Sequence, residues 1–418
     1  MSKIWIHIES QPERGTEYTD LISAAPLSLG VKGVNVDKWP YNPFPGRRVI
    51  ARFTFPNAGD GYEHSYMRRG WAGAGDYVRA LQSRYQHVLA WGIDEFESPN
   101  EPIPEEADLR AYLDFMLRWV EIAPSFGFRP WVGQWPNGWP HDGWGAYMAE
   151  LAQAAYEAGG GMGVHGYSAP GLLDAADCMT LRYRRTAQEL WGAGLPKDKT
   201  RMILSEFGID GMALANRDVR RDVAKLYGMT DLPTNKRGWR DWQDWRSYHA
   251  EYGIPAGGMT EARYLAQIKA FSAEIDKDDY LDGAALYGGL PFKGWGQFVI
   301  GGGMLREIVR WHEETPPEPE PEPTPEPELS LHDKAVSVRW RMEEAVRMIE
   351  RADPDEARTL LLQAIPDAYE VERALKDHVT ITSQWETRTI DDKGAVTTTS
   401  HDGVGTYWVP PETKQEWG

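Results

Sequence analysis

The chain is poor in cysteine, in basic residues and in long apolar runs, and each shortage excludes a class of protein. Cys178 is the one cysteine among 418 residues, which rules out an internal disulfide framework or a cysteine metal cluster. The 45 Lys and Arg residues are outnumbered by 63 Asp and Glu residues. The resulting net charge of −18 argues against nucleic acids and anionic membrane surfaces as partners. No apolar run approaches the roughly 18–20 residues that a membrane span needs.

The first ten residues also lack the basic and then apolar layout of a secretory signal. We therefore expect a cytoplasmic protein, or one that is released or carried on a phage by a route that needs no signal.

Tryptophan and tyrosine are unusually abundant. The chain has 19 of each, against 11 phenylalanines. Both side chains combine an apolar face with a polar edge, which suits them to surfaces that grip partly polar ligands such as sugar rings. Packing in a large core explains any single tryptophan equally well, and the hydrophobic content of 41% is sufficient for such a core.

Composition divides the chain into four parts. Residues 315–328 hold seven prolines and five glutamates, which favours an extended polyproline II spacer. Residues 1–314 precede this linker. After it, we expect a helical segment over 329–378 and a β-hairpin over 379–418. So small a tail is unlikely to be very stable alone, so we expect it to mediate oligomerisation or docking to a larger assembly.

Strand and helix patterns alternate through the first 314 residues, which is typical of a parallel sheet. We expect helices at 107–122, 144–157 and 261–275. The expected strands are 3–9, 32–37, 48–55, 87–96, 129–134, 162–168, 200–206 and 281–287. Eight such units predict a (β/α)8 TIM barrel. An open doubly wound sheet is the alternative, but the segment after the first strand lacks the glycine-rich phosphate turn of that fold.

Two glutamates follow or end expected strands. Glu101 lies in the segment FESPNEP after the fourth strand, and Glu206 lies in ILSEFG at the seventh. Catalytic groups of a barrel sit at the carboxyl ends of its strands. Two carboxylates there are the minimum equipment for cleaving a glycosidic bond, because one donates a proton and the other attacks or stabilises the anomeric carbon. Each could instead serve a structural role at the barrel rim, and Glu95 and Glu97 crowd Glu101.

Asn100-Glu101-Pro102 at strand four and Ser205-Glu206-Phe207-Gly208 at strand seven together resemble the retaining glycoside hydrolases of clan A, which include families 5 and 39. The resemblance spans roughly residues 1–312. It implies that Glu101 is the acid/base and Glu206 the nucleophile, and that Asn100 binds the sugar 2-hydroxyl.

The sixth expected strand carries His165-Gly166-Tyr167, which is similar to the His-x-Tyr motif of family 5. The resemblance implies that Tyr167 hydrogen-bonds the nucleophile and that His165 lines the site. Arg52 is similar to the arginine that keeps the nucleophile ionised. A buried structural role explains His165 or Arg52 equally well. With both glutamates in place, the charge of Glu206 is expected to raise the pKa of Glu101.

Aromatic residues near the expected strand ends are candidates for sugar stacking. Trp135 and Trp139 follow the fifth expected strand, and Tyr287 and Trp295 occupy the region where the clan often has a tryptophan at strand eight. None of the ten histidines forms an HxH or HExxH pattern, so we expect no zinc site and no cofactor.

The sequence therefore predicts a retaining hydrolase that cleaves a β-linked oligo- or polysaccharide. The alternative is a carbohydrate-binding or structural barrel that has lost turnover, and such a barrel would suit a phage or prophage assembly.

Overall fold

The computed structural model describes most of the first 314 residues and two strands near the C-terminus. The described residues are 2–9, 11–13, 16–55, 60–102, 104–174, 179–214, 217–226, 228–232, 259–288, 300, 302–314, 382–390 and 396–404. The chain divides into two compact units, Met1–Pro323 and Thr324–Gly418. Within the described residues, no helix has the length and apolar character needed to cross a membrane.

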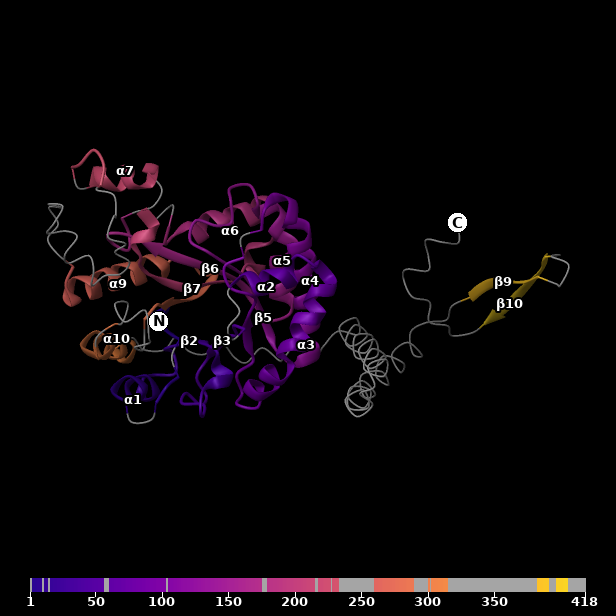
Figure 1. Ribbon diagram of the computed structural model, residues 1–418, viewed down its shortest axis with the longest axis horizontal. Coiled ribbons are helices and arrows are strands. Elements are labelled where there is room, and N and C mark those ends of the chain that lie inside the picture. Colours follow the sequence, from indigo (N-terminus) through magenta and orange to yellow (C-terminus); the bar gives the residue numbers. More distant parts are fainter. Residues whose placement is uncertain are drawn as a thin grey trace. The chain divides into compact units, whose positions relative to one another are not determined.

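The first unit contains a closed barrel of eight parallel strands, which is the (β/α)8 TIM-barrel architecture (Figure 1). Each strand pairs with the next in chain order, and β8 closes the barrel by pairing with β1. The strands are β1 (Ile4–Ile8), β2 (Val31–Val34), β3 (Val49–Arg52), β4 (Glu95–Glu97), β5 (Arg129–Trp135), β6 (Gly161–Ser168), β7 (Met202–Ile209) and β8 (Leu281–Leu286).

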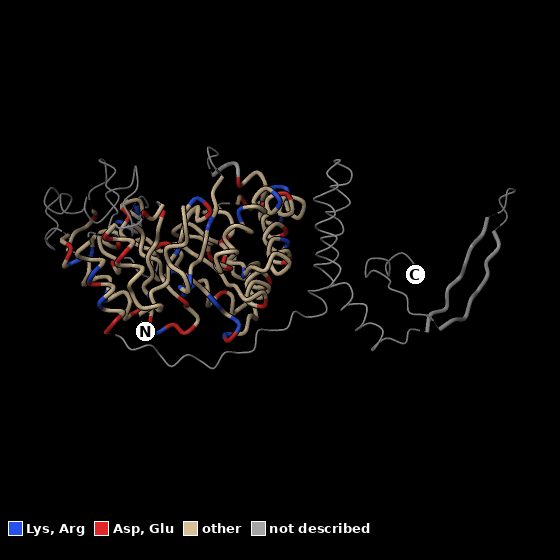
Figure 2. Tube along the Cα trace, turned by 90° about the horizontal axis from the view of Figure 1, so that it is seen from below, with Lys and Arg blue, Asp and Glu red and all other residues tan. Residues whose placement is uncertain are grey.

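Helices surround the barrel and follow its strands along the chain. They are α1 (Glu17–Ala24), α2 (Asp60–Met67), α3 (Gly70–Leu89), α4 (Leu109–Phe126), α5 (Gly145–Glu157), α6 (Arg182–Gly192), α7 (Arg217–Leu226), α9 (Glu261–Ile275) and α10 (Gly302–Glu314). The three helices expected at 107–122, 144–157 and 261–275 correspond to α4, α5 and α9. Figure 2 shows that basic and acidic residues are interspersed along the described part of this unit.

The prediction of the fourth strand was wrong over most of its length. Residues 87–89 belong to α3, and β4 covers only Glu95–Glu97. Leu81, Tyr85 and Val88 are buried at helical spacing, so the apolar run continues a helix. Gly92 then adopts a left-handed backbone (φ 77°), which glycine tolerates without steric cost and which lets the chain turn into the strand.

Three other strands differ from their predicted bounds by more than one residue at an end, and of these the third strand ends at Arg52 rather than at residue 55. The second ends at Val34, because Asn35 adopts a left-handed conformation (φ 52°) and a 3₁₀ turn, Val36–Lys38, follows. The seventh extends to Ile209, so Glu206 lies within β7 and not at its last residue.

Tryptophans fill part of the barrel interior. Trp5 of β1 and Trp131 of β5 are buried in one core cluster with Ile50, Ile203 and Ala285. The strand glycine Gly283 makes room for Trp5, because a Cβ atom there would lie 2.4 Å from the indole. For these two tryptophans, the packing interpretation holds.

The second unit is described only in part. β9 (Thr382–Ile390) pairs antiparallel with β10 (Val396–Val404), with Ile390 opposite Val396. The predicted linker at 315–328 and the helical segment at 329–378 lie outside the described residues. The role expected for the tail stays a prediction.

The packing of Trp5 gives a stability prediction. Gly283→Ala should lower the free energy of unfolding by about 1–3 kcal/mol, because the added methyl group overpacks the barrel interior. Gly192→Ala is the matched control: a Cβ atom at this last residue of α6 would have no neighbour within 4 Å. The control should leave stability unchanged or raise it by up to about 1 kcal/mol, since alanine is the better helix former. Urea unfolding measures both; equal stability of Gly283→Ala and the wild type would contradict the packing.

Candidate active site

The backbone of β7 turns Glu206 toward the interior. Ile203 already faces the core cluster, and strict alternation would direct a residue three positions later to the other face of the strand. The pairing registers shift on both sides of β7, after Val164 of β6 and between Leu204 and Phe207. Such bulges re-aim side chains near functional sites. Here the irregularity allows Ile203 and Glu206 both to face inward.

The Glu206 carboxylate is held by three donors inside the barrel. Its Oε1 accepts from Lys32 Nζ at 2.9 Å and from Arg52 Nη1 at 2.8 Å. Its Oε2 accepts from the Tyr167 hydroxyl at 2.8 Å. The contacts expected for Arg52 and Tyr167 are therefore present, and Lys32 adds a second cation.

These cations decide the ionisation of Glu206. Burial alone would raise its pKa, but the nearby charges of His165, Lys32 and Arg52 hold the pKa well below the usual range. Glu206 is therefore ionised at neutral pH, as an attacking carboxylate must be.

Glu101 lies at the rim, in the loop after β4. Its backbone N–H donates to the Gln134 carbonyl at 3.1 Å, and its backbone is left-handed (φ 42°). A non-glycine residue in that conformation is strained, and such strain clusters at functional sites. The side chain is 40% exposed and its Oε1 lies 2.9 Å from His165 Nδ1. Glu101 is thus accessible to a ligand while one polar partner holds it.

His165 lies between the two carboxylates. Its Nδ1 is 2.9 Å from Glu101 Oε1 and 3.6 Å from Glu206 Oε2. Glu101 Oε1 and Glu206 Oε2 can therefore be separated by at most the sum of these two distances. The fold thus brings together two glutamates that are distant in the sequence.

The pKa of Glu101 differs from the sequence-based expectation. Burial and the charge of Glu206 do raise it, but the hydrogen bond and charge of His165 outweigh them and leave the pKa below its usual value. The expectation was wrong because it considered only the second carboxylate and not the histidine between the two.

Asn100 is anchored beside both glutamates. Its Oδ1 accepts a hydrogen bond from Arg52 Nη1, which also binds Glu206. Its backbone N–H donates to Glu63 of α2 at 3.4 Å. The loop that carries Glu101 is therefore linked both to the Glu206 site and to α2.

The structure describes three of the four aromatic residues expected to stack on sugars, and their role stays a prediction. Trp135 is fully buried and packs against Tyr112 and Trp139, so its ring offers no surface to a sugar. The prediction missed this because the residue belongs to β5 and not to the following loop. Trp139 is half-buried, and Tyr287 is 9% exposed and stacks on His7 at 4.6 Å. Trp295 lies outside the described residues.

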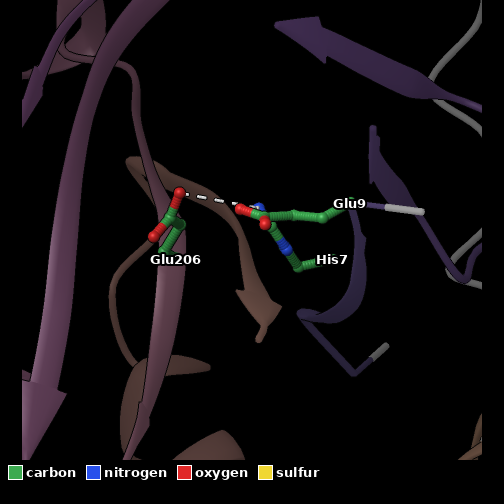
Figure 3. Close-up of side chains that lie close together, drawn as sticks. All are labelled: His7, Glu9 and Glu206. Carbon is green, nitrogen blue, oxygen red and sulfur yellow. Dashed lines mark ion pairs between the residues drawn. The ribbon is translucent and has the colours of Figure 1, made fainter. Parts of the chain in front are cut away.

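Three buried or half-buried polar residues near Glu206 were not identified from the sequence: His7, Glu9 and Lys32. Glu97, which the sequence indicated only as a neighbour of Glu101, is buried beside Lys32. Figure 3 shows the Glu206 carboxylate facing His7 and Glu9. His7 Nε2 is 3.5 Å from Glu206 Oε1, and Lys32 Nζ is 3.3 Å from Glu97 Oε2. The available signal was a polar residue within an otherwise apolar strand, as in IWIHIE and VKGV. Such a residue in a parallel barrel strand is buried and needs a partner.

The three residues in Figure 3 also resemble a metal-ligand set. Ligand atoms of His7, Glu9 and Glu206 all lie within 4.8 Å of one another. Burial and the charge of Lys32 lower the pKa of His7 to about 3, so its imidazole is neutral. However, Glu206 Oε1 already accepts hydrogen bonds from two cations, Lys32 and Arg52. A metal ion would have to displace or oppose both charges, so the arrangement does not fit one.

The acids beside Glu101 have separate structural partners. Glu95 forms a two-hydrogen-bond pair with Arg48 and accepts from the Trp131 indole N–H at 2.7 Å. Asp94 pairs with Arg129. These partners favour Glu101 over Glu95 as the group that meets a ligand.

The pairing of Lys32 with two buried acids gives a stability prediction. Lys32→Met should lower the free energy of unfolding by about 3–5 kcal/mol, because it leaves Glu97 without its cation and removes one of the two cations that bind Glu206. The double variant Lys32→Met/Glu97→Gln should recover part of that loss. The control Lys199→Met removes an exposed pair with Glu157 and should change stability little. Urea unfolding measures all four proteins, and a double variant no more stable than Lys32→Met would contradict this pairing.

The chain was also compared with known proteins. It matches no protein-family model, and no curated protein matches it significantly. The fold is therefore shown by the closed eight-stranded barrel itself, and function must be argued from the residues of the site.

Proposed function

We propose that this protein is a retaining glycosidase that cleaves a β-linked glycan, with Glu206 as the nucleophile and Glu101 as the acid/base. One observation carries the proposal: oxygens of both carboxylates lie within 3.6 Å of the same atom, His165 Nδ1. Retaining enzymes separate their carboxyl groups by about 5–5.5 Å and inverting enzymes by about 6.5–9.5 Å. The largest separation of these two oxygens that the contacts with His165 allow does not exceed the lower end of the inverting range, which favours retention.

The chemistry follows from the positions of the two groups. Glu101 donates its proton to the glycosidic oxygen while a Glu206 oxygen attacks the anomeric carbon, so the leaving sugar departs as an alcohol. Glu101, now ionised, removes a proton from water, and the water oxygen displaces Glu206 from the glycosyl-enzyme. The product keeps its anomeric configuration, and both carboxyl groups return to their starting states.

The surrounding residues suit the proposed roles of Glu206 as nucleophile and Glu101 as acid/base. Lys32, Arg52 and the Tyr167 hydroxyl keep Glu206 ionised and fix its orientation. Asn100 precedes Glu101 in the chain, and its side-chain oxygen accepts a hydrogen bond from Arg52, which supports the contact with the sugar 2-hydroxyl that the clan A resemblance implies. The resemblance to clan A adds the same roles for Glu101 and Glu206.

The two carboxyl variants test the proposal. Glu206→Ala should abolish hydrolysis of β-linked 4-nitrophenyl glycosides, and added azide should restore turnover by replacing the missing carboxylate. Glu101→Ala should lower kcat/KM by about 10²–10⁴ on ordinary glycosides but spare 2,4-dinitrophenyl glycosides, which need no proton. Glu157→Gln changes an exposed acid and is the control. Near-normal activity of both alanine variants, or inversion in an NMR assay of the product anomer, would contradict the proposal.

The directions of the pKa shifts predict an acidic working range. Glu101 must be protonated and Glu206 ionised, so kcat/KM should peak between their two pKa values. Both values lie below the ordinary glutamate value of 4.5, that of Glu206 further so. His165→Asn should raise the pKa of Glu101 by removing its partner, and should therefore move the alkaline limb of kcat/KM to higher pH. His87→Asn, at an exposed position on α3, should leave the profile unchanged. An unmoved alkaline limb would show that Glu101 is not the group that titrates.

The contact between His165 and Glu101 also favours a second function, a carbohydrate-binding barrel without turnover. At neutral pH the His165 contact keeps Glu101 ionised, and an ionised carboxyl group cannot donate a proton. Glycan binding with no hydrolysis at any pH from about 3 to 8 would favour this second candidate over the glycosidase.

A further inference from the structure

A pocket lies against the loop that carries Glu101. The loop from β4 to α4 contributes Pro102, Pro104 and Glu105, and the start of α4 contributes Asp108 and Tyr112. The opposite wall is the end of α2, with His64, Met67 and Arg68. The segments after β3 and β4 lie at the carboxyl ends of the strands, so this pocket opens on the same face of the barrel as Glu101. Its empty space, open to solvent, is about 430 Å³.

Tyr112, one of the lining residues, carries a buried polar group without a partner among the described residues. The Tyr112 hydroxyl has no hydrogen-bond partner among the described residues, although the residue is only 2% exposed. Burial raises the Tyr112 pKa well above its usual value, so the hydroxyl stays a donor. His64 Nε2 is also buried and lacks a partner among those residues. A buried unsatisfied polar group is costly, and a ligand hydroxyl placed here would satisfy it.

The remaining lining matches the chemistry of a neutral sugar. Pro102, Pro104 and Met67 supply apolar surface for the C–H face of a ring. Arg68 and Asp108 form an exposed ion pair at 3.5 Å, and their remaining donor and acceptor positions, with those of Glu105, can hydrogen-bond a ligand. Two carboxylates disfavour an anionic ligand. Pockets that are apolar with a few placed polar groups are typical of small-molecule sites.

The pocket is coupled to the proposed acid/base. Glu63 of α2 accepts from the backbone N–H groups of Phe55 and Asn100, each at 3.4 Å. Asn100 precedes the strained Glu101, and Pro102, which lines the pocket, follows it. A ligand in the pocket therefore contacts the segment that positions the proton donor.

We propose that this pocket binds a neutral sugar residue on the leaving-group side of the scissile bond, with the Tyr112 hydroxyl as its central hydrogen-bond donor. This inference rests on the proposed function, because the leaving group is defined by the role of Glu101. It assigns the enzyme to glycans that continue beyond the cleaved bond, so the leaving group is a sugar and not a small aglycone.

Kinetics with two kinds of leaving group test the pocket. Tyr112→Phe removes the hydroxyl but keeps the ring that packs on Trp135, and Arg68→Ala removes the neighbouring donor. Both should lower kcat/KM about threefold to tenfold on a β-linked hexasaccharide, the loss expected for one hydrogen bond. Neither should change kcat/KM on the 2,4-dinitrophenyl glycoside of the same sugar, whose leaving group does not fill the pocket. Arg110→Ala is the control: this exposed residue of α4 pairs with Asp114 and does not line the pocket.

A binding arm separates this inference from the proposed function. Isothermal titration of cellohexaose, mannohexaose, xylohexaose, chitohexaose and laminarihexaose into the Glu206→Gln protein, with and without Tyr112→Phe, needs no turnover. If Tyr112→Phe weakens hexasaccharide binding threefold to tenfold and the wild-type protein hydrolyses none of these glycans, the proposed sugar site stands and the proposed hydrolysis is wrong. If Tyr112→Phe leaves kcat/KM on the hexasaccharide unchanged, the proposed hydrolysis stands and the proposed sugar site is wrong, because the pocket then holds only water. A hexasaccharide loss matched by an equal loss on the aryl glycoside, or no binding of any hexasaccharide, would also overturn the pocket.

Discussion

The candidate site depends on one buried charge, the carboxylate of Glu206. A carboxylate in the interior of a barrel is stable only when cations and hydrogen-bond donors replace the water it has lost. Lys32 and Arg52 bind one of its oxygens and Tyr167 the other. Because these partners come from β2, β3 and β6, the barrel must close correctly for Glu206 to be ionised. Folding and the chemistry of the site therefore share the same contacts.

The barrel interior has an apolar layer and a charged layer. The apolar layer contains Trp5 and Trp131, with Gly283 leaving the space that Trp5 fills. In β1 and β3 the polar side chains of the charged layer begin two residues later, with the neutral His7 after Trp5 and Arg52 after Ile50, because side chains two positions apart share one face of a strand. In β7 the register shift replaces this spacing and brings Glu206 to the charged layer. The packed layer supports the polar one and keeps water out beneath it.

His165 influences the ionisation of both glutamates. It contacts Glu101 closely and Glu206 more distantly, and it lowers the pKa of both. Under the proposed function, the Glu101 proton needed for glycoside cleavage is then available only under acidic conditions. The loop after β4 holds strained backbone at Glu101 and is hydrogen-bonded to Glu63 of α2. The pocket lined by α2 and the start of α4 therefore contacts the segment that carries Glu101.

Local patterns in the sequence determined the barrel fold and several residues of the candidate site. Alternating strands and helices indicated the barrel, and the short motifs around Glu101, Glu206, Tyr167 and Arg52 identified residues that the fold brings together. Such patterns extend over a few residues, so a strand–turn–helix order is readable from them. A sequence pattern does not show which strand ends meet across the barrel.

Only the tertiary structure decided the rest. Lys32, His7 and Glu97 became part of the site because barrel closure places their strands within reach of Glu206 or of one another. Trp135 lost its expected role because α4 presents Tyr112 against it. The pKa of Glu101 is lowered because β6 places His165 beside it. Each outcome depends on contacts between segments far apart in the chain, and charge, burial and hydrogen bonding are set by those contacts.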